Sequence, residues 1–324
     1  DSKVLNEIVV VGYGVQKKSD VTGAMVSVNS DQLNTRPVSN AFEALQGKAA
    51  GVDITSSERP GTVGSIRIRG NRSISASGTP LYVVDGVQLS AGGMESINPR
   101  DIESIDILKD ASSTAIYGSR GANGVVLITT KRGQVGKMSM NYSGSVTVEN
   151  LEDKSPAMSA SDYITWRRWA YYNSDPTRNP LGNQPNQVKD QSYFSGDDYA
   201  LANVNRGWES GQWDGSKVQD TDWGALVTRT GITNEHTLSG SGGTENAQAF
   251  FSVGYLNNQG TQRGQDYSRY NFSMSVDLKL KPWFKMGGSI NGSWSNQDYG
   301  YSRTGQSSNS GPTDIYNAAK AIPR

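Results

Sequence analysis

The sequence predicts a small α+β domain followed by antiparallel β-strands that are long enough to cross a membrane. Residues 80–133 combine short helical patterns with short strand patterns, which is typical of an α+β domain. Residues 138–149 and most of residues 231–295 instead alternate between apolar and polar side chains. About 10 residues of such alternation is the signature of a transmembrane β-strand. We count five such strands, whereas a plugged outer-membrane barrel needs about 22. We therefore expect an incomplete barrel, in an N-terminal piece of a longer protein.

The composition excludes several classes of function. The 31 basic and 31 acidic residues cancel, so no electrostatic footprint for nucleic acid is visible. The absence of cysteine excludes a disulfide scaffold and thiolate metal sites. A single histidine, His236, cannot supply a histidine-rich metal site, and we interpret it as a strand residue rather than part of a catalytic triad. We expect no catalytic residues, no metal and no cofactor, although acidic pairs such as Asp197 and Asp198 leave a glycosidase formally open.

The aromatic residues are biased towards those with one polar end. Tyrosine (15) and tryptophan (7) together far outnumber phenylalanine (6). Such side chains suit membrane interfaces and sugar-binding surfaces. No apolar run approaches the roughly 20 residues of a membrane helix. A barrel escapes this test, because its strands alternate and their hydropathy signal is weak.

The first 50 residues predict two strands and a helix. Residues 8–11 form an extended β-branched run, which indicates an edge strand. Residues 21–28 alternate as a second strand. Asn40 followed by Glu43 is a capping box, which predicts a helix to about Ala50.

Two further short strands follow over residues 52–54 and 66–70. Their period of two places Arg67 and Arg69 on the same side of the second strand. On an ordinary domain these two arginines form a solvated face.

The mixed segment of residues 80–133 predicts a strand, a turn, a short helix, a strand, a second helix and a long strand. Asp85-Gly86 marks the turn, and Asn98-Pro99 marks a helix start, because Asn caps free amides and Pro tolerates the first helical position. A second helix begins at Asp110 and is expected to end at Gly118 in a left-handed conformation. Residues 125–128 are continuously aliphatic, which predicts a strand covered on both faces.

The alternating strands are connected by short turns on one side and by long loops on the other. Turns are expected at residues 243–246 and near Pro282. The stretch of residues 151–230 is far longer than an ordinary loop, and it predicts one helix, over residues 162–172. Short turns at one end and long loops at the other are typical of outer-membrane barrels. We therefore expect residues 151–230 to lie outside the cell.

The segments PLYVVDG, INPRDIESIDILKDASSTAIYGSRGANGV and LITTKRG run almost without a break through residues 80–133. This region resembles the signature of the SusC-like TonB-dependent transporters (the RagA/SusC family) of the Bacteroidota outer membrane. The resemblance implies that residues 12–133 are a plug domain, lodged inside a barrel whose first part is residues 134–324. It also implies that residues 1–11 contain the TonB contact; these residues overlap the family-like segment LNEIVVVGYGVQKKSDVTGA, which begins at Leu5.

The resemblance implies roles for individual residues. The TonB-contact residues would be Glu7, Ile8, Val9, Val10 and Val11. Arg67 and Arg69, in the family-like segment IRIRG, would contact the barrel wall. Plug loops and three tryptophans of the long loop would face the substrate; these residues are Asn71, Arg72, Ser73, Ser75, Gln88, Ser90, Glu95, Trp208, Trp213 and Trp223.

The function that this resemblance implies is active import of nutrient oligomers across the outer membrane. TonB, a SusD-like surface lipoprotein, the cargo and outer-membrane lipid would be the partners. Oligosaccharides are the commoner cargo of the family, and peptides are the second choice. An interpretation from a different class, a surface sugar-binding or adhesin β-protein, fits the tryptophan-rich loop and the alternating strands. A membrane importer would require detergent for extraction, whereas a surface sugar-binding or adhesin protein would be soluble.

Overall fold

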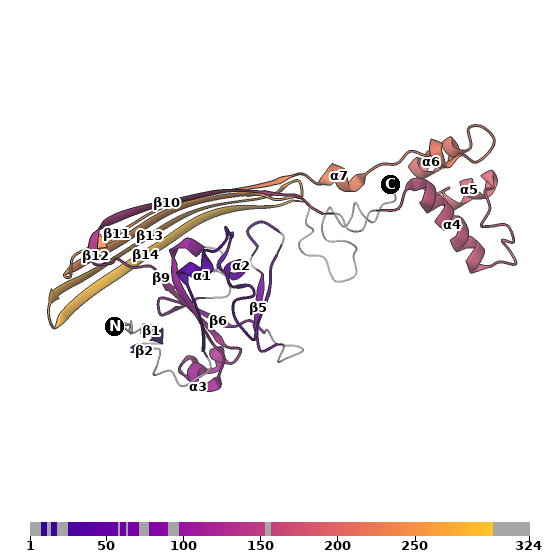
Figure 1. Cartoon of the computed structure of the whole chain (residues 1–324). Helices are drawn as coiled ribbons and strands as arrows, with labels where there is room; N and C mark the ends of the chain where they lie inside the picture. The colour runs from indigo at the N-terminus through magenta and orange to yellow at the C-terminus, as the bar shows by residue number, and fades with distance from the viewer. Residues whose placement is uncertain are drawn as a thin grey trace. The chain divides into compact units, whose positions relative to one another are not determined.

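The computed structural model describes residues 8–11, 14–17, 25–57, 59–62, 64–70, 78–89, 97–152 and 157–300. The chain forms two compact units. One unit holds the N-terminal α+β domain and the long strands, and the other consists mainly of residues 150–230. Figure 1 shows the elements of each unit.

The α+β domain is built on a five-stranded sheet with the order β3-β8-β9-β6-β7. These strands are β3 (Met25–Asn29), β8 (Ile102–Leu108), β9 (Val125–Thr130), β6 (Leu81–Val84) and β7 (Val87–Gln88). The central β9 is antiparallel to β8 and parallel to β6, and its first four residues are buried. This confirms the prediction of a strand covered on both faces, because a central strand has neighbours at both edges and packed layers above and below.

Short helices pack on the sheet and begin where the sequence predicts caps. α2 (Ala41–Leu45) begins after Asn40, whose side chain accepts the Phe42 and Glu43 amides at 3.0 Å. η3 (Pro99–Asp101) begins after Asn98, whose side chain accepts the Arg100 amide at 3.0 Å. The sequence did not predict α1 (Ser30–Leu33), which a true capping box between Asn29 and Gln32 stabilises.

Two predicted helix ends in this domain are wrong. The helix after Asn40 ends at Leu45 rather than near residue 50, because Gln46 leaves the helical conformation (ψ 125°) and Gly47 follows in the left-handed region (φ 76°). The helix after Asp110 is α3 (Ala111–Thr114), and a 3-10 helix, η4 (Ala115–Gly121), continues beyond Gly118. Gly118 does adopt a left-handed φ of 60°, but it kinks the helical segment instead of ending it.

Two small hairpins complete the domain. β4 (Val52–Thr55) pairs with β5 (Ser65–Ile68), and the latter ends one residue before Arg69, which has a left-handed φ of 58°. The predicted strand to residue 70 is therefore too long. β1 (Ile8–Val11) pairs with β2 (Gly14–Lys17) in a separate antiparallel ribbon.

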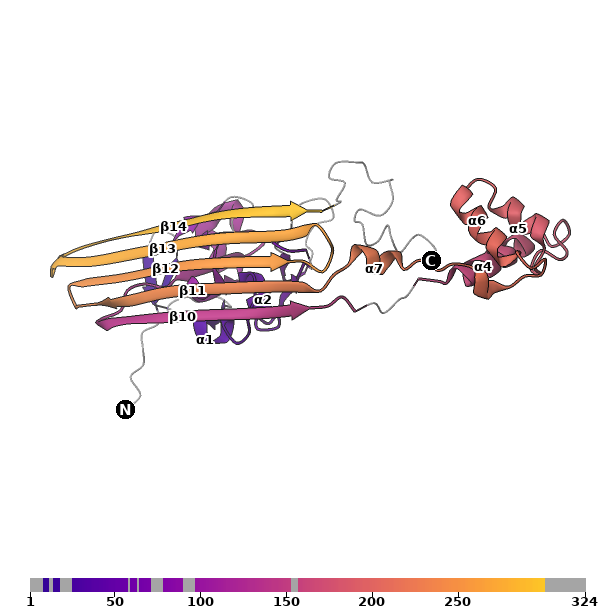
Figure 2. The same cartoon turned by 90° about the horizontal axis from the view of Figure 1, so that it is seen from above.

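The long strands form one antiparallel sheet in sequence order, as Figure 2 shows. They are β10 (Gly136–Glu149), β11 (Gly231–Gly243), β12 (Ala247–Gln259), β13 (Gln265–Lys281) and β14 (Phe284–Tyr299). All five predicted strands and the turns near residues 244–246 and Pro282 are present, but β12 and β13 extend into residues 257–266, which the sequence predicts to be a loop. The alternation also sorts the side chains by face, because successive strand residues point to opposite sides.

The second unit contains more helix than the sequence predicts. The predicted helix is α4 (Ala160–Ser174), capped by Ser159. It is followed by α5 (Gln187–Tyr193), α6 (Asp198–Gly207), η5 (Gly215–Lys217) and α7 (Trp223–Val227). Within the described ranges, no helix combines the length and the hydropathy that crossing a bilayer would require.

Candidate functional site

The α+β domain lies on one side of the sheet of long strands (Figure 1), and hydrogen bonds join it to polar side chains on that side. Large apolar side chains on the opposite face are exposed, among them Met138, Met140, Val146, Val148, Val253, Phe272 and Met274. Most of the covered face is polar: its buried polar residues include Thr233, Glu235, Thr237, Ser252, Arg269, Asn271, Ser273 and Ser275, and Phe250, Leu256 and Tyr267 are buried on the same face. This is the reverse of a water-soluble sheet, which buries its apolar face. It suits a wall with lipid outside and a polar interior.

A buried ion pair joins the α+β domain to this wall. Arg100 of η3 donates from Nε to Oε1 of Glu235 and from Nη2 to Oε2, both at 3.3 Å. The Glu235 side chain is only 7% exposed, and that of Arg100 is 22% exposed. The two parallel bonds fix both position and orientation, which a single point contact would not do.

The cap residue of η3 makes a second contact with the same strand. Asn98 Nδ2 donates to Thr237 Oγ1 at 3.2 Å, while Asn98 Oδ1 caps η3. Gly254 on the neighbouring strand leaves room for this amide, since a Cβ there would lie 2.6 Å from Asn98 Nδ2. One short segment therefore starts a helix and docks the domain at the same time.

Two more contacts lie elsewhere on the strands. Arg132 Nη1 donates to Asp277 Oδ1 at 3.3 Å, with side chains that are 47% and 36% exposed. Gln297 Nε2 donates to the Pro60 carbonyl at 2.7 Å and to Thr62 Oγ1 at 3.2 Å. The domain is thus held at several separate points by hydrogen bonds and charges.

Asp101, next to the buried ion pair, is itself buried. Its Oδ1 makes no hydrogen bond to any other described residue. Burial raises the pKa of the Asp101 carboxyl, and the Ser252 hydroxyl together with the positive charges of Lys131 and Arg269 partly opposes that rise.

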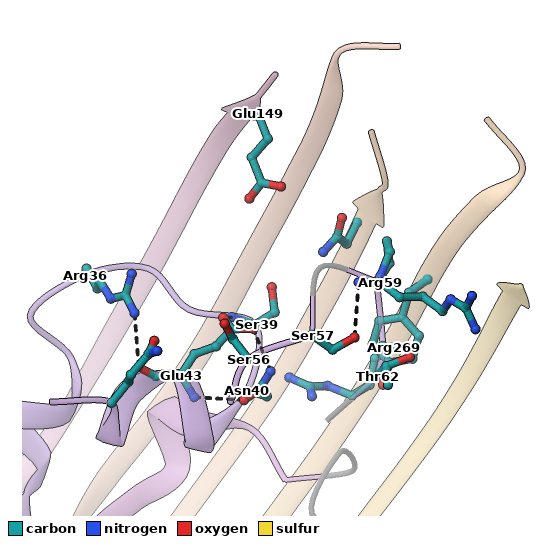
Figure 3. A pocket seen from close by; sticks show the side chains of 15 residues that line it. Arg36, Ser39, Asn40, Glu43, Ser56, Ser57, Arg59, Thr62, Glu149 and Arg269 are labelled. Carbon is teal, nitrogen blue, oxygen red and sulfur yellow. Dashed lines mark hydrogen bonds between the residues drawn. The ribbon is translucent and has the colours of Figure 1, made fainter. Parts of the chain in front are cut away.

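A polar cavity of about 240 Å³ lies between the α+β domain and the wall (Figure 3). Arg36, Glu43 and Arg59 approach it from the domain, and Glu149 and Arg269 from the strands. Neighbouring groups hold Glu43 in place: its carboxylate accepts the Ser39 amide at 3.3 Å and Asn40 Nδ2 at 2.8 Å. Burial raises the pKa of the Glu43 carboxyl. With donors and acceptors of both charges, the cavity suits a polar ligand.

The structure positions only some of the residues to which the sequence assigned roles. Ile8, Val9, Val10 and Val11 form β1, and Glu7 lies outside the described residues. The predicted loop residues Asn71, Arg72, Ser73, Ser75, Ser90 and Glu95 also lie outside them. Gln88 is described, and its side-chain oxygen accepts from Arg120 Nη1 at 2.8 Å.

The two arginines predicted to contact the wall have other surroundings in the structure. Arg67 is exposed on β5, and Arg69 pairs with Asp110 of the same domain. The ion pairs that reach the wall come from Arg100 and Arg132 instead. The sequence signal that could have found Arg100 is its place in η3, two residues after the Asn98 cap.

The three tryptophans that the sequence assigned to the substrate, Trp208, Trp213 and Trp223, are half-buried. Trp208 donates from Nε1 to Asp190 Oδ2 at 3.0 Å, and the Trp213 ring lies 4.1 Å from the Arg168 guanidinium. Trp223 begins α7 and lies edge-on to Tyr199, with ring centroids 6.4 Å apart. Two of the three thus take part in the packing of this unit.

Comparison with known proteins agrees with this architecture. Residues 17–125 match the TonB-dependent receptor plug domain. A TonB-dependent receptor of Formosa agariphila is 36% identical over 297 residues, which are 91% of this chain and 25% of the relative. The TonB-dependent receptor SusC of Bacteroides thetaiotaomicron is 33% identical over 285 residues, 85% of this chain and 25% of the relative. The chain belongs to the SusC-like TonB-dependent receptors.

Solved structures of the SusC-like receptors share the fold. The RagAB peptide importer in its open-open state superposes with a TM-score of 0.72 at 30% identity, over 93% of this chain and 34% of that chain. The α+β domain is therefore a plug domain, followed by antiparallel strands of a receptor barrel. The chain spans about a quarter of the length of the curated relatives above. Among the described residues, no group of three or more acidic, histidine or cysteine side chains could hold a metal ion.

The two ion pairs between plug and wall should differ in their contribution to docking. Arg100→Ala leaves the buried Glu235 carboxylate with the Ser145 hydroxyl, at 3.4 Å, and the nearby charge of Arg269, and we expect it to weaken plug docking by about 1–3 kcal/mol. Arg132→Ala removes an exposed pair and should cost at most about 1 kcal/mol. The loss of docking stability in each variant is measured as the shift in the urea concentration at which trypsin cleaves the plug of the purified receptor. Equal shifts in the two variants would contradict this ranking.

Burial of Asp101 should make plug docking weaker as the pH rises. Because its folded-state pKa is raised above the ordinary 3.8, the folded state keeps the proton to a higher pH than the unfolded chain. Stability should therefore fall as the pH rises from near 4 through the raised pKa. Asp101→Asn should flatten this fall and raise the urea midpoint at pH 7. The exposed Asp53→Asn is the control, and an equal gain there would refute the explanation.

Proposed function

We propose that the protein imports nutrient oligomers across the outer membrane in a TonB-dependent reaction, with a SusD-like surface lipoprotein as its partner. The observation that carries this proposal is the plug domain held by ion pairs on the polar face of the strands, whose other face is apolar. Family membership supports the same conclusion. The proposed organisation is a TonB-contact segment at residues 1–11, a plug at 12–133, and barrel strands with a long external loop at 151–230.

A plug held at several points must be displaced before cargo can pass, and displacement requires work. β1 is a suitable handle, because a strand edge can pair with a strand of a partner protein. Among the residues that the structure describes, β1 pairs with β2, in a sheet of two strands. We propose that TonB pairs with Ile8–Val11 and pulls on the plug.

The proposed cargo is an oligosaccharide. The cavity between plug and wall supports a polar cargo, since arginines and carboxylates of both surfaces line it. Such groups can bond the hydroxyls of a sugar chain. Peptides are the second candidate, favoured by the likeness to the RagAB peptide importer, and the mixed charges of the cavity would also suit a peptide backbone with its charged ends.

Deletion of Ile8–Val11 should abolish energised uptake while leaving cargo binding intact. The deletion removes the handle but none of the plug–wall contacts described above. Uptake of labelled oligomers by cells and binding to the purified receptor are the two measurements. The conservative variant Val10→Ile, which keeps the strand propensity, should take up cargo normally.

Normal uptake by the deletion variant would place the TonB contact elsewhere. A protein that is recovered without detergent, and not from outer membranes, would instead favour a surface sugar-binding protein.

A further inference from the structure

The helical unit contains a cavity of its own, which the import machinery described above does not use. It has a volume of about 230 Å³ and lies between α4, the end of α5 and α6. Figure 2 shows these three helices packed together. The wall residues are Ala160, Tyr163, Ile164, Arg167, Tyr193, Phe194, Gly196, Asp197, Tyr199, Ala200, Asn203 and Val204.

A buried ion pair holds the helices around this cavity. Arg168 of α4 donates from Nε and Nη2 to the two carboxylate oxygens of Asp190 of α5, at 2.9 and 2.7 Å. Both side chains are almost fully buried, at 3% and 0% exposed. Trp208 donates to Asp190, and the Trp213 ring covers Arg168. The fully satisfied pair supports a preformed cavity rather than one that a ligand must create.

The walls of the cavity present aromatic rings above an aliphatic floor. Tyr163 and Phe194 meet edge to face with centroids 6.2 Å apart, and Tyr199 is 58% exposed. Ile164 and Val204 are both buried beneath them. Rings arranged in this way offer apolar contact to the C–H face of a ligand ring.

Two side chains of opposite charge add hydrogen-bonding capacity. The Arg167 guanidinium lies 5.0 Å from the Phe194 ring centroid and donates to the Tyr163 hydroxyl at 3.3 Å. A guanidinium has further N–H donors, which a ligand can use. Asp197 Oδ1 accepts the Tyr199 and Ala200 amides, both at 3.0 Å, and among the described residues no partner engages Oδ2.

We propose that this cavity binds one pyranose ring of an oligosaccharide, as a capture site on the helical unit. A sugar ring has both a C–H face for the aromatic walls and hydroxyls for Arg167 and Asp197. An aromatic side chain of a peptide would fill the cavity but offer no hydrogen bond to the remaining Arg167 donors or to Asp197 Oδ2, and covering such groups without a partner is costly. The choice of an oligosaccharide as the ligand rests on the proposed import function. The presence of the cavity is independent of that function.

Two variants and one control test the proposal on the purified receptor. Tyr199→Ala removes an exposed aromatic wall. Asp197→Asn removes the charge but keeps a good helix cap, because Asn caps as well as Asp. Trp169→Ala is the control: Trp169 is 46% exposed on α4, but it does not line the cavity. Calorimetry measures binding of the trisaccharides of glucose, galactose, mannose and xylose, and of an alanine-phenylalanine-alanine peptide with blocked ends.

We expect at least one trisaccharide to bind, about tenfold more weakly to Tyr199→Ala and to Asp197→Asn, and equally well to Trp169→Ala. Unchanged affinity in both cavity variants would overturn the proposal, and so would binding of the peptide alone or of none of the probes. Uptake by the variant that lacks Ile8–Val11 distinguishes failure of the proposed import function from failure of the proposed capture site. If that deletion abolishes uptake while the cavity variants bind normally, only the capture site is wrong.

Discussion

The plug must satisfy the polar groups of the wall that it covers, and the rest of the structure depends on this constraint. Covering a strand face rich in Ser, Thr, Asn, Arg and Glu removes those groups from water, and an unpaired buried polar group is costly. Arg100 bonds Glu235 and Asn98 bonds Thr237, and both plug residues lie in one capped turn. The location of η3 on the plug therefore follows from the chemistry of the wall.

A polar interface also suits a domain that has to move. An apolar interface would expose hydrophobic surface on opening, whereas the groups of this interface can exchange their partners for water. The net gain from each hydrogen bond is only about 0.5–1.5 kcal/mol, because water competes for the same groups. Some polar atoms in the interface are buried without a hydrogen-bond partner among the described residues, including Asp101 Oδ1 on the plug and Asn258 Oδ1 and Ser275 Oγ on the wall. Docking is thus specific in its geometry and moderate in strength, as the proposed import requires.

The sequence predicts the strands of this protein better than its site. Alternation predicts the five long strands and their turns, because period two directly reflects which face each side chain occupies. It misses α5 and α6, because these helices are short and polar and only their caps, Asn186 and Asp197, mark them. Arg100 and Glu235 are 135 positions apart, so no local pattern could pair them.

Local sequence patterns also fail to identify the residues that line the cavity of the helical unit. The spacing of Trp208, Trp213 and Trp223 suggested a surface for ligands, whereas in the structure the first two pack around the Arg168–Asp190 pair. The rings around the cavity come from α4, α5 and the start of α6, and only the packing of these helices brings them together. The kind of side chain was foreseeable from the composition, but the particular residues were not.

The most direct test of the central claim is a cross-link between plug and wall. This chain contains no cysteine, so Asn98→Cys and Thr237→Cys introduce a defined pair at a 3.2 Å contact. In outer membranes treated with a mild thiol oxidant, we expect a disulfide bridge in the double variant and in neither single variant. We also expect the bridged receptor to bind cargo but no longer to import it. Absence of the bridge would contradict the docking described here, and undiminished import by a fully bridged receptor would contradict the need for the plug to leave the wall.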